Sequence, residues 1–139
     1  MPPPKRRRHD DAPVLARFPL HLGRRSRALP QPEFTGMEWY AAYFERHASD
    51  GDDAWIAQQF SFSESWTSCE RHPLGDEAVI CASGEITLIQ ELPDGPRKID
   101  LRAGDYAVNP RGVWHTADVS GRATALFITA GRGTEHRPR

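Results

Sequence analysis

The chain of 139 residues carries 18 Lys and Arg against 19 Asp and Glu, which gives a formal net charge of −1. This length allows one domain with a buried core and is too short for two domains that each have a core of their own. No apolar run approaches the roughly 20 residues that a membrane helix needs, and the charged N-terminus is not followed by the apolar segment of a secretory signal. We therefore expect a cytoplasmic protein with no membrane partner.

The N-terminal part of the chain is basic and rich in proline. Residues 1–30 contain eight Lys and Arg against Asp10 and Asp11, so this part carries +6 and the remainder −7. Because no aromatic side chains interrupt the basic run, we interpret residues 1–12 as a disordered extension, and a nucleic-acid contact is the less favoured alternative. The predicted organisation is a partly disordered extension over residues 1–30 and a single domain over residues 31–139.

Two segments before residue 54 show apolar periodicity. Residues 14–22 alternate loosely, which predicts an edge strand or an arm on a partner subunit. Residues 37–49 carry aromatic side chains at spacings of one, three and four, which predicts an amphipathic helix of about three turns. We expect this aromatic stripe to pack on the outside of a sheet rather than to form a ligand platform, and we expect His47 to be a partly exposed helix residue rather than a ligand.

From Ala54 onward the apolar period changes to two, and turns rich in Gly, Pro and Asp separate the segments. The predicted strands are residues 55–62, 66–72, 77–82, 85–92, 97–101, 106–108, 114–119 and 123–129. This pattern predicts a mainly β domain, either a sandwich or a small barrel. Cys69 and Cys81 should project to opposite faces, so we expect two reduced, buried thiols rather than a disulfide. Residues 131–139 are polar, and we assign no function to them.

Acidic and histidine side chains gather around the second predicted strand. Glu70 and His72 are two residues apart, so both side chains point to the same face of a sheet. Glu77 follows across a turn, so a strand running back can offer its carboxylate to the same point. His115 lies 43 residues beyond His72, so only a fold that returns the chain can add it to the group.

The spacing of these residues resembles the two sequence motifs of the cupin superfamily. The first motif is matched at its second His, its Glu and its closing Gly by His72, Glu77 and Gly84, while Glu70 replaces its first His. The second motif is matched at Gly104, Pro110, Gly112 and His115, with Val119 where the family often has Asn. These seven spaced positions are much more specific than a single short motif, and the resemblance covers roughly residues 55–130.

The resemblance implies a cupin jelly roll, preceded here by one amphipathic helix, that often pairs as a homodimer. On strand parity, the inward-facing side chains form a mostly apolar cavity with a small polar cluster at one place. The inward positions expected besides the four polar residues are Trp66, Ser68, Val79, Cys81, Ala117 and Val119.

Two carboxylates and two imidazoles converging in such a cavity have an electrostatic reason to bind a divalent cation. Glu70, His72, Glu77 and His115 are therefore the candidate ligands of Fe, Mn, Ni, Co or Zn. By analogy with the family, the expected function is a metal-dependent oxygenase, isomerase or lyase that acts on a small polar molecule. The alternative is a module that binds or senses a small ligand without a stoichiometric metal, because Glu70 in place of His lowers nitrogen donation.

Overall fold

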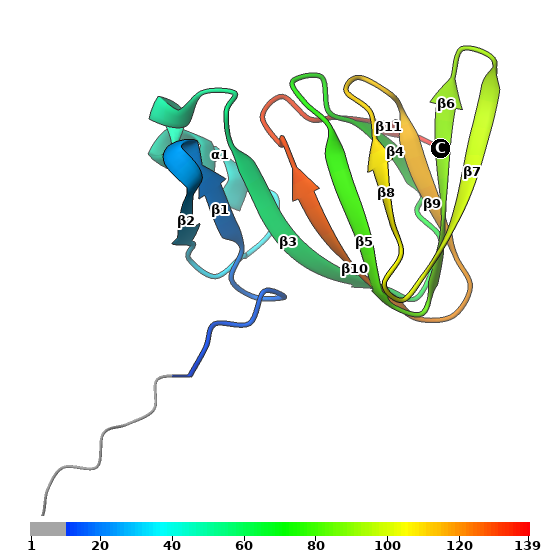
Figure 1. Cartoon of the computed structure of the whole chain (residues 1–139), viewed down its shortest axis with the longest axis horizontal. Coiled ribbons are helices and arrows are strands. Elements are labelled where there is room, and N and C mark those ends of the chain that lie inside the picture. The colour runs from blue at the N-terminus through cyan, green and yellow to red at the C-terminus, as the bar shows by residue number, and fades with distance from the viewer. Residues whose placement is uncertain (1–10) are drawn as a thin grey trace, which may run out of the picture.

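Two antiparallel sheets face each other in the computed structural model, which describes residues 11–139 (Figure 1). The six-stranded sheet contains, in spatial order, β2 (Arg27–Pro30), β1 (Leu20–Gly23), β3 (Trp55–Phe62), β10 (Ala123–Thr129), β5 (Glu77–Ser83) and β8 (Tyr106–Asn109). The five-stranded sheet contains β11 (Glu135–Pro138), β4 (Ser68–Arg71), β9 (His115–Val119), β6 (Glu85–Leu92) and β7 (Gly95–Arg102). The mainly β class is confirmed, and the two sheets form an open jelly roll. Most of the predicted disordered stretch, residues 1–12, lies outside the described residues.

All eight predicted strands are present, as β3 to β10. Three of them, β3, β6 and β10, have the predicted bounds. The largest differences at a strand start are two residues: β4 begins at Ser68 instead of residue 66, and β7 begins at Gly95 instead of residue 97. Leu92 pairs with Gly95, so only Pro93 and Asp94 form the turn between β6 and β7. Because the turn has only two residues, the hydrogen bonds between β6 and β7 continue up to it, and β7 is longer than predicted.

The predicted helix is shorter than expected. Helix α1 spans Trp39–Arg46, and a separate 3₁₀ turn, Ala48–Asp50, follows it. Trp39 and Tyr43 are buried against Ile56 of β3, so part of the aromatic stripe packs on the sheet as predicted. Within the described residues, no helix has the length and apolar character needed to cross a membrane.

The structure differs from the prediction at the N-terminal hairpin of β1 and β2 and at the C-terminal strand β11. Strands β1 and β2 form a hairpin, and β1 also pairs with β3, so β1 lies inside the sheet of its own chain with β2 at the edge. The prediction of an edge strand over residues 14–22 was therefore wrong in position, because the hairpin partner covers that edge. The C-terminal strand β11 pairs with β4 over four residues, although the sequence there is entirely polar.

The core lies between the two sheets. Val79, Cys81 and Ala117 are completely buried there and Val119 nearly so, as strand parity predicted. Cys69 and Cys81 are free and buried, which confirms that they are not paired with each other. Gly84, the closing Gly of the first motif, has φ +74, and a Cβ there would lie 2.2 Å from the carbonyl oxygen of Arg122, so only glycine fits this turn.

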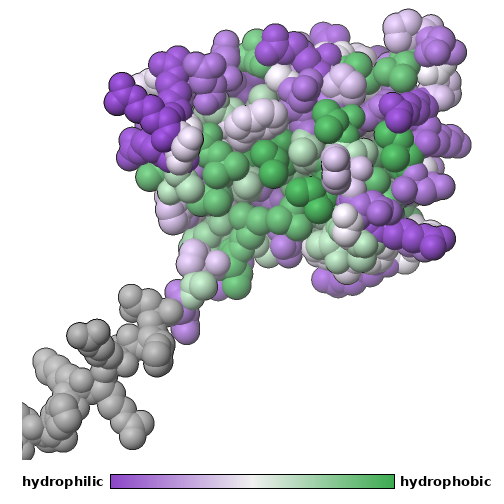
Figure 2. Space-filling model, viewed as in Figure 1, coloured by the Kyte–Doolittle hydropathy of each residue, from purple (hydrophilic) through white to green (hydrophobic). Residues whose placement is uncertain are grey.

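The outer face of the six-stranded sheet is also apolar. Figure 2 shows apolar side chains across the middle of the face over β3, β10, β5 and β8, with polar residues around them. The outward side chains on β5, β8 and β10 include Ala78, Ile80, Tyr106, Val108, Leu126 and Ile128. Tyr106 and Val108 are exposed, and the other four are half-buried. We call these six residues the outer apolar face.

Candidate metal centre

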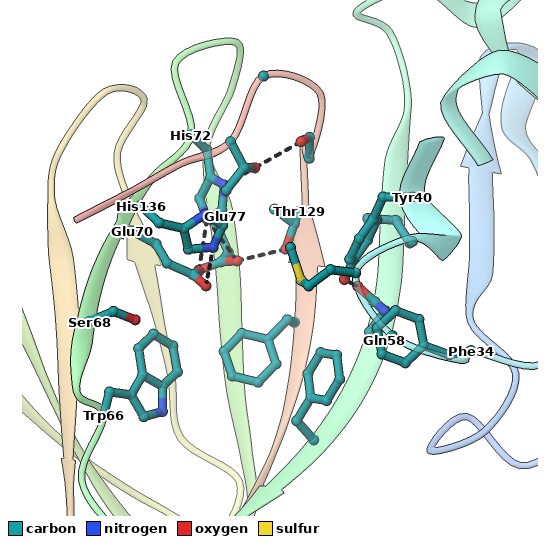
Figure 3. A pocket seen from close by; sticks show the side chains of 18 of the residues that line it. Phe34, Tyr40, Gln58, Trp66, Ser68, Glu70, His72, Glu77, Thr129 and His136 are labelled. Atoms are coloured by element: carbon teal, nitrogen blue, oxygen red, sulfur yellow. Dashed lines mark hydrogen bonds and ion pairs between the residues drawn. The ribbon is translucent and has the colours of Figure 1, made fainter. Parts of the chain in front are cut away.

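The structure brings the four candidate ligands together inside the roll. Glu70, His72, Glu77 and His115 each offer one ligand atom, and these atoms all lie within 4.8 Å of one another. Glu70 lies on β4, His72 directly follows that strand, and Glu77 and His115 begin β5 and β9. Glu70, His72 and Glu77 line one end of a cavity, where their side chains point toward one another (Figure 3), and His115 is buried behind them.

Strand register explains why these side chains meet. Directly paired residues on neighbouring strands point to the same face of a sheet. In the five-stranded sheet the paired row across β11, β4, β9 and β6 is His136, Glu70, His115 and Gln90. In the facing sheet the row across β10, β5 and β8 is Thr129, Glu77 and Asn109. A slip of one residue in any of these strands would turn its member of the row away from the cavity.

Glu77 is a fixed carboxylate held by its two neighbouring strands. Asn109 Nδ2 donates to its Oε1 at 3.1 Å, and Thr129 Oγ1 donates to its Oε2 at 2.7 Å. Burial by itself raises the pKa of Glu77, but His115 and His72 beside it outweigh burial and hold that pKa well below its usual range. Glu77 is therefore negatively charged at neutral pH.

His72 is oriented by the segment that leads into β11. Its Nδ1 lies 2.9 Å from Thr134 Oγ1, and the Thr134 hydroxyl donates its own proton to the carbonyl oxygen of Gly131 at 2.8 Å. The hydroxyl must therefore accept from Nδ1–H, which leaves Nε2 as the atom that faces the cluster. Burial lowers the pKa of His72, but the adjacent Glu77 carboxylate, helped by Glu70, outweighs burial, so the pKa lies above 6.5.

His115 is oriented by the backbone that precedes it. Its Nδ1 lies 3.4 Å from the carbonyl oxygen of Val113, an atom that can only accept. Nδ1 therefore carries the proton, and Nε2 presents its lone pair to the cluster.

The buried atoms of the cluster fit a metal ion. Nε2 of His72 and Nε2 of His115 are buried and have no hydrogen-bond partner, although they lie 3.1 Å and 3.3 Å from the oxygens of Glu77. Glu70 Oε2 lies 3.9 Å from both of these nitrogens. Imidazole lone pairs and carboxylate oxygens that face one point repel one another unless a proton or a metal ion lies between them. Two nitrogens and two hard oxygens form a donor set suited to a divalent transition metal.

His136 is a member of the site that the sequence did not reveal. Its Nε2 lies 3.1 Å from Glu70 Oε1, and it lines the cavity next to the cluster (Figure 3). It therefore holds one oxygen of Glu70 and leaves Oε2 directed at His72 and His115. Asn109, Thr129 and Thr134 were also missed as supporting residues, because only the strand register places them beside the ligands.

The cavity has a volume of about 680 Å³ and extends from the metal-ligand cluster to α1. Trp66 and Ser68 line it, as strand parity predicted, while the other predicted inward positions belong to the packed core. Tyr40 and Phe44 of α1 line the opposite end, so the helix contributes to the cavity wall as well as to packing. This volume lies within the range of small-molecule sites.

A second group of possible ligands, His21, His47 and Asp50, lies outside the cavity. Both ring nitrogens of His21 already have partners, Tyr43 Oη at 2.6 Å and Asp50 Oδ2 at 2.6 Å. His47 is half-buried and stacks on His21 with ring centroids 3.7 Å apart. These bonds tie β1 to α1 and to the turn after it, and they account for the group without a ligand.

No protein-family model and no curated protein sequence matches the chain. Similar solved structures include oxalate oxidase in complex with the substrate analogue glycolate (19% identity, 58% of this chain and 45% of that chain, TM-score 0.52) and a second oxalate oxidase structure (19% identity, 58% and 44%, TM-score 0.51). A cupin-2 domain-containing protein from Shewanella frigidimarina is aligned at 20% identity over 61% of this chain and 71% of that chain, with a TM-score of 0.46. The chain spans less than half the length of oxalate oxidase.

Proposed function

The chain has the cupin fold, and we propose that it binds a divalent transition metal through Glu70, His72, Glu77 and His115 and acts as a metal-dependent enzyme on a small molecule in the cavity. The observation that carries this proposal is the pair of buried Nε2 atoms of His72 and His115, which lack hydrogen-bond partners and face two carboxylates. The reaction classes that suit the site are oxygenase, isomerase and lyase. A bound metal of this kind supplies Lewis-acid or redox chemistry to the substrate.

The protein residues have separable roles in this proposal. Glu77 supplies a negative charge, because His115 and His72 hold its pKa well below the usual range, and Asn109 and Thr129 fix the positions of both of its oxygens. His72 and His115 supply the nitrogens, each with its other ring nitrogen directed at a hydrogen-bond acceptor. Glu70 is half-exposed to the cavity, so it is the ligand that an incoming substrate reaches first.

Glu70 also supports the second candidate function, a binding or sensing cupin without a stoichiometric metal. Its Oε1 is bonded to His136, so this carboxylate has a partner within the protein. The likeness to oxalate oxidase does not decide between the two functions, because an identity of 19% shows the fold alone. The activity and the substrate of oxalate oxidase therefore do not carry over.

Equilibrium dialysis followed by elemental analysis tests the proposal. We expect about one Fe, Mn, Co, Ni or Zn ion per chain in the wild type, and almost none in His72→Ala or His115→Ala. His47→Ala is the matched control, because His47 lies outside the cluster and its loss should leave the stoichiometry unchanged. A wild type that stays substoichiometric in every metal leaves the ligand-binding alternative as the better account. If a metal binds, oxygen-uptake and isomerase screens follow.

A further inference from the structure

Aromatic rings build most of the cavity wall beyond the metal-ligand cluster. Phe60 of β3 and Phe127 of β10 lie 5.9 Å apart between ring centroids, and Trp66 lies 6.1 Å from Phe127. On the other side, Phe34 lies 5.8 Å from Phe60 and 5.5 Å from Tyr40. These rings form one continuous wall from α1 to the segment before β4, and flat apolar molecules pack well against such a wall.

The two carboxylates that line the cavity would be neutralised by a bound divalent ion alone, without a charged substrate. Among the lining residues, all of which lie in the described part of the chain, there is no Lys and no Arg, and the only carboxylates are Glu70 and Glu77. A divalent ion in the cluster cancels these two charges. Apart from His72 and His136 at the cluster, a carboxylate on a ligand would then find no side-chain cation along the wall, and burying an unpaired charge there is costly.

The wall also contains hydrogen-bond donors that lack partners. Gln58 is 94% buried, its Oε1 accepts from the Tyr40 hydroxyl at 2.7 Å, and its Nε2 has no partner. Trp66 Nε1 is likewise buried and without a partner. Leaving such N–H groups unsatisfied is unfavourable, and a small rotation of either side chain toward the cavity would let an uncharged hydroxyl or carbonyl oxygen of a ligand accept from it.

We infer that the cavity takes uncharged aromatic molecules that carry a hydroxyl or carbonyl group, and that it discriminates against aromatic carboxylates. This inference rests on the proposed function for the charge balance at the metal, whereas the aromatic wall and the absence of a wall cation are independent of it. One ring with a short polar substituent fits easily, since a cavity of about 150 Å³ already holds benzene.

Three probes of almost equal size separate the charge classes: benzyl alcohol, benzoate and benzylammonium. Calorimetric titration of the metal-free protein should show benzyl alcohol binding at least about tenfold more tightly than benzoate. Zn(II)-loaded protein should bind benzyl alcohol more tightly than benzylammonium. Benzoate binding the metal-free protein as tightly as benzyl alcohol, or benzylammonium binding best in the Zn(II) form, would overturn the inference. Because the first comparison needs no metal, it remains decisive even if the metal proposal fails.

A charge introduced into the wall gives the complementary test. Ser68 lines the cavity, and its side chain makes no hydrogen bond in the structure, so Ser68→Lys adds the missing cation without removing a contact. We expect this variant to gain at least about tenfold in benzoate affinity, while Ser68→Met, the uncharged control of similar length, does not. Equal benzoate binding by the two variants would contradict the role of the missing cation.

Discussion

Glu70 stands where the resembled motif has its first His, and its surroundings explain how a carboxylate is accommodated. It pairs across the strands with His115 on one side and His136 on the other. The oxygen toward His136 accepts a hydrogen bond, so the other oxygen is held toward the cluster. Glu70 thus offers an oxygen in place of the nitrogen of the motif's first His, and His136 of β11 sets the position of this candidate ligand.

Glu70→His tests this reading of the substitution. The variant restores a nitrogen donor at the same strand position, so we expect it to bind Co(II) or Zn(II) at least as tightly as the wild type. Glu70→Ala leaves three ligands and should weaken binding by about tenfold or more. Competition titration against a chromophoric chelator measures both. A Glu70→His variant that binds no better than Glu70→Ala would show that residue 70 does not face the ion.

The raised pKa of His72 gives the site a defined pH dependence. A proton on His72 must leave before a metal binds, so metal affinity should continue to rise with pH above 6.5 until the raised pKa is passed. In the metal-free protein, stability should change with pH in the opposite direction. The ion pair of His72 with Glu77 stabilises the fold fully below pH 6.5, and this stabilisation is lost as the pH rises through the pKa of His72 in the folded protein. Thermal melting between pH 6 and 9 should therefore fall with pH without metal and rise with metal. Parallel curves for the two forms would contradict this assignment.

At the level of elements, β11 connects the C-terminal segment to the metal centre. Its pairing with β4 places His136 beside Glu70, and Thr134 just before the strand fixes the ring of His72. Arg137 stacks over the Trp114 ring at 4.3 Å, which fastens the strand to the segment before β9. β11 is therefore both an edge of the sheet and the support for two candidate ligands.

Removing residues 134–139 should show how strongly the metal affinity depends on β11. The truncated protein loses the partners of Glu70 and His72 together, so we expect metal affinity to fall by at least about tenfold. The double variant Thr134→Val with His136→Leu keeps the strand and removes only the two hydrogen bonds, and we expect it to account for most of the loss. Metal affinity unchanged by the truncation, measured on protein that circular dichroism shows to be folded, would contradict the supporting role of β11.

The strand pattern and the convergence of the four candidate ligands could be predicted, because period-two alternation is local in the sequence and the motif spacing resembles that of a known fold. The supporting residues could not, because Asn109, Thr129 and His136 reach the site through register between strands distant in sequence. β11 was missed for a similar reason: its residues are polar and exposed, so no apolar alternation marks it. The helix was overextended because its aromatic spacing continues beyond Arg46, where the backbone tightens into a 3₁₀ turn.

At the scale of the whole molecule, the outer apolar face is the surface that most needs a partner. Sheet faces that remain apolar on both sides are usually covered by another layer. Its residues pair across β8, β5 and β10, so the surface is continuous. We propose that a second copy of the chain covers it, which gives the homodimer expected from the cupin resemblance.

Sedimentation at micromolar concentration tests the dimer. We expect about twice the chain mass of 15.6 kDa for the wild type and a monomer for Val108→Glu, because a charge in the outer apolar face cannot be buried without a partner. Lys98→Glu, on the exposed surface of the other sheet, is the control and should remain dimeric. A monomeric wild type would reject the proposal.

Melting of the purified protein with and without a metal chelator tests the central claim most directly. An ion bound a thousandfold above its Kd stabilises the folded state by about 4 kcal/mol, which corresponds to a shift of more than about 5 °C in a chain of this size. We predict that removing the metal lowers the Tm of the wild type by at least this amount and leaves the Tm of His115→Ala unchanged. Equal Tm values for the wild type with metal and with chelator would contradict a metal centre built from Glu70, His72, Glu77 and His115.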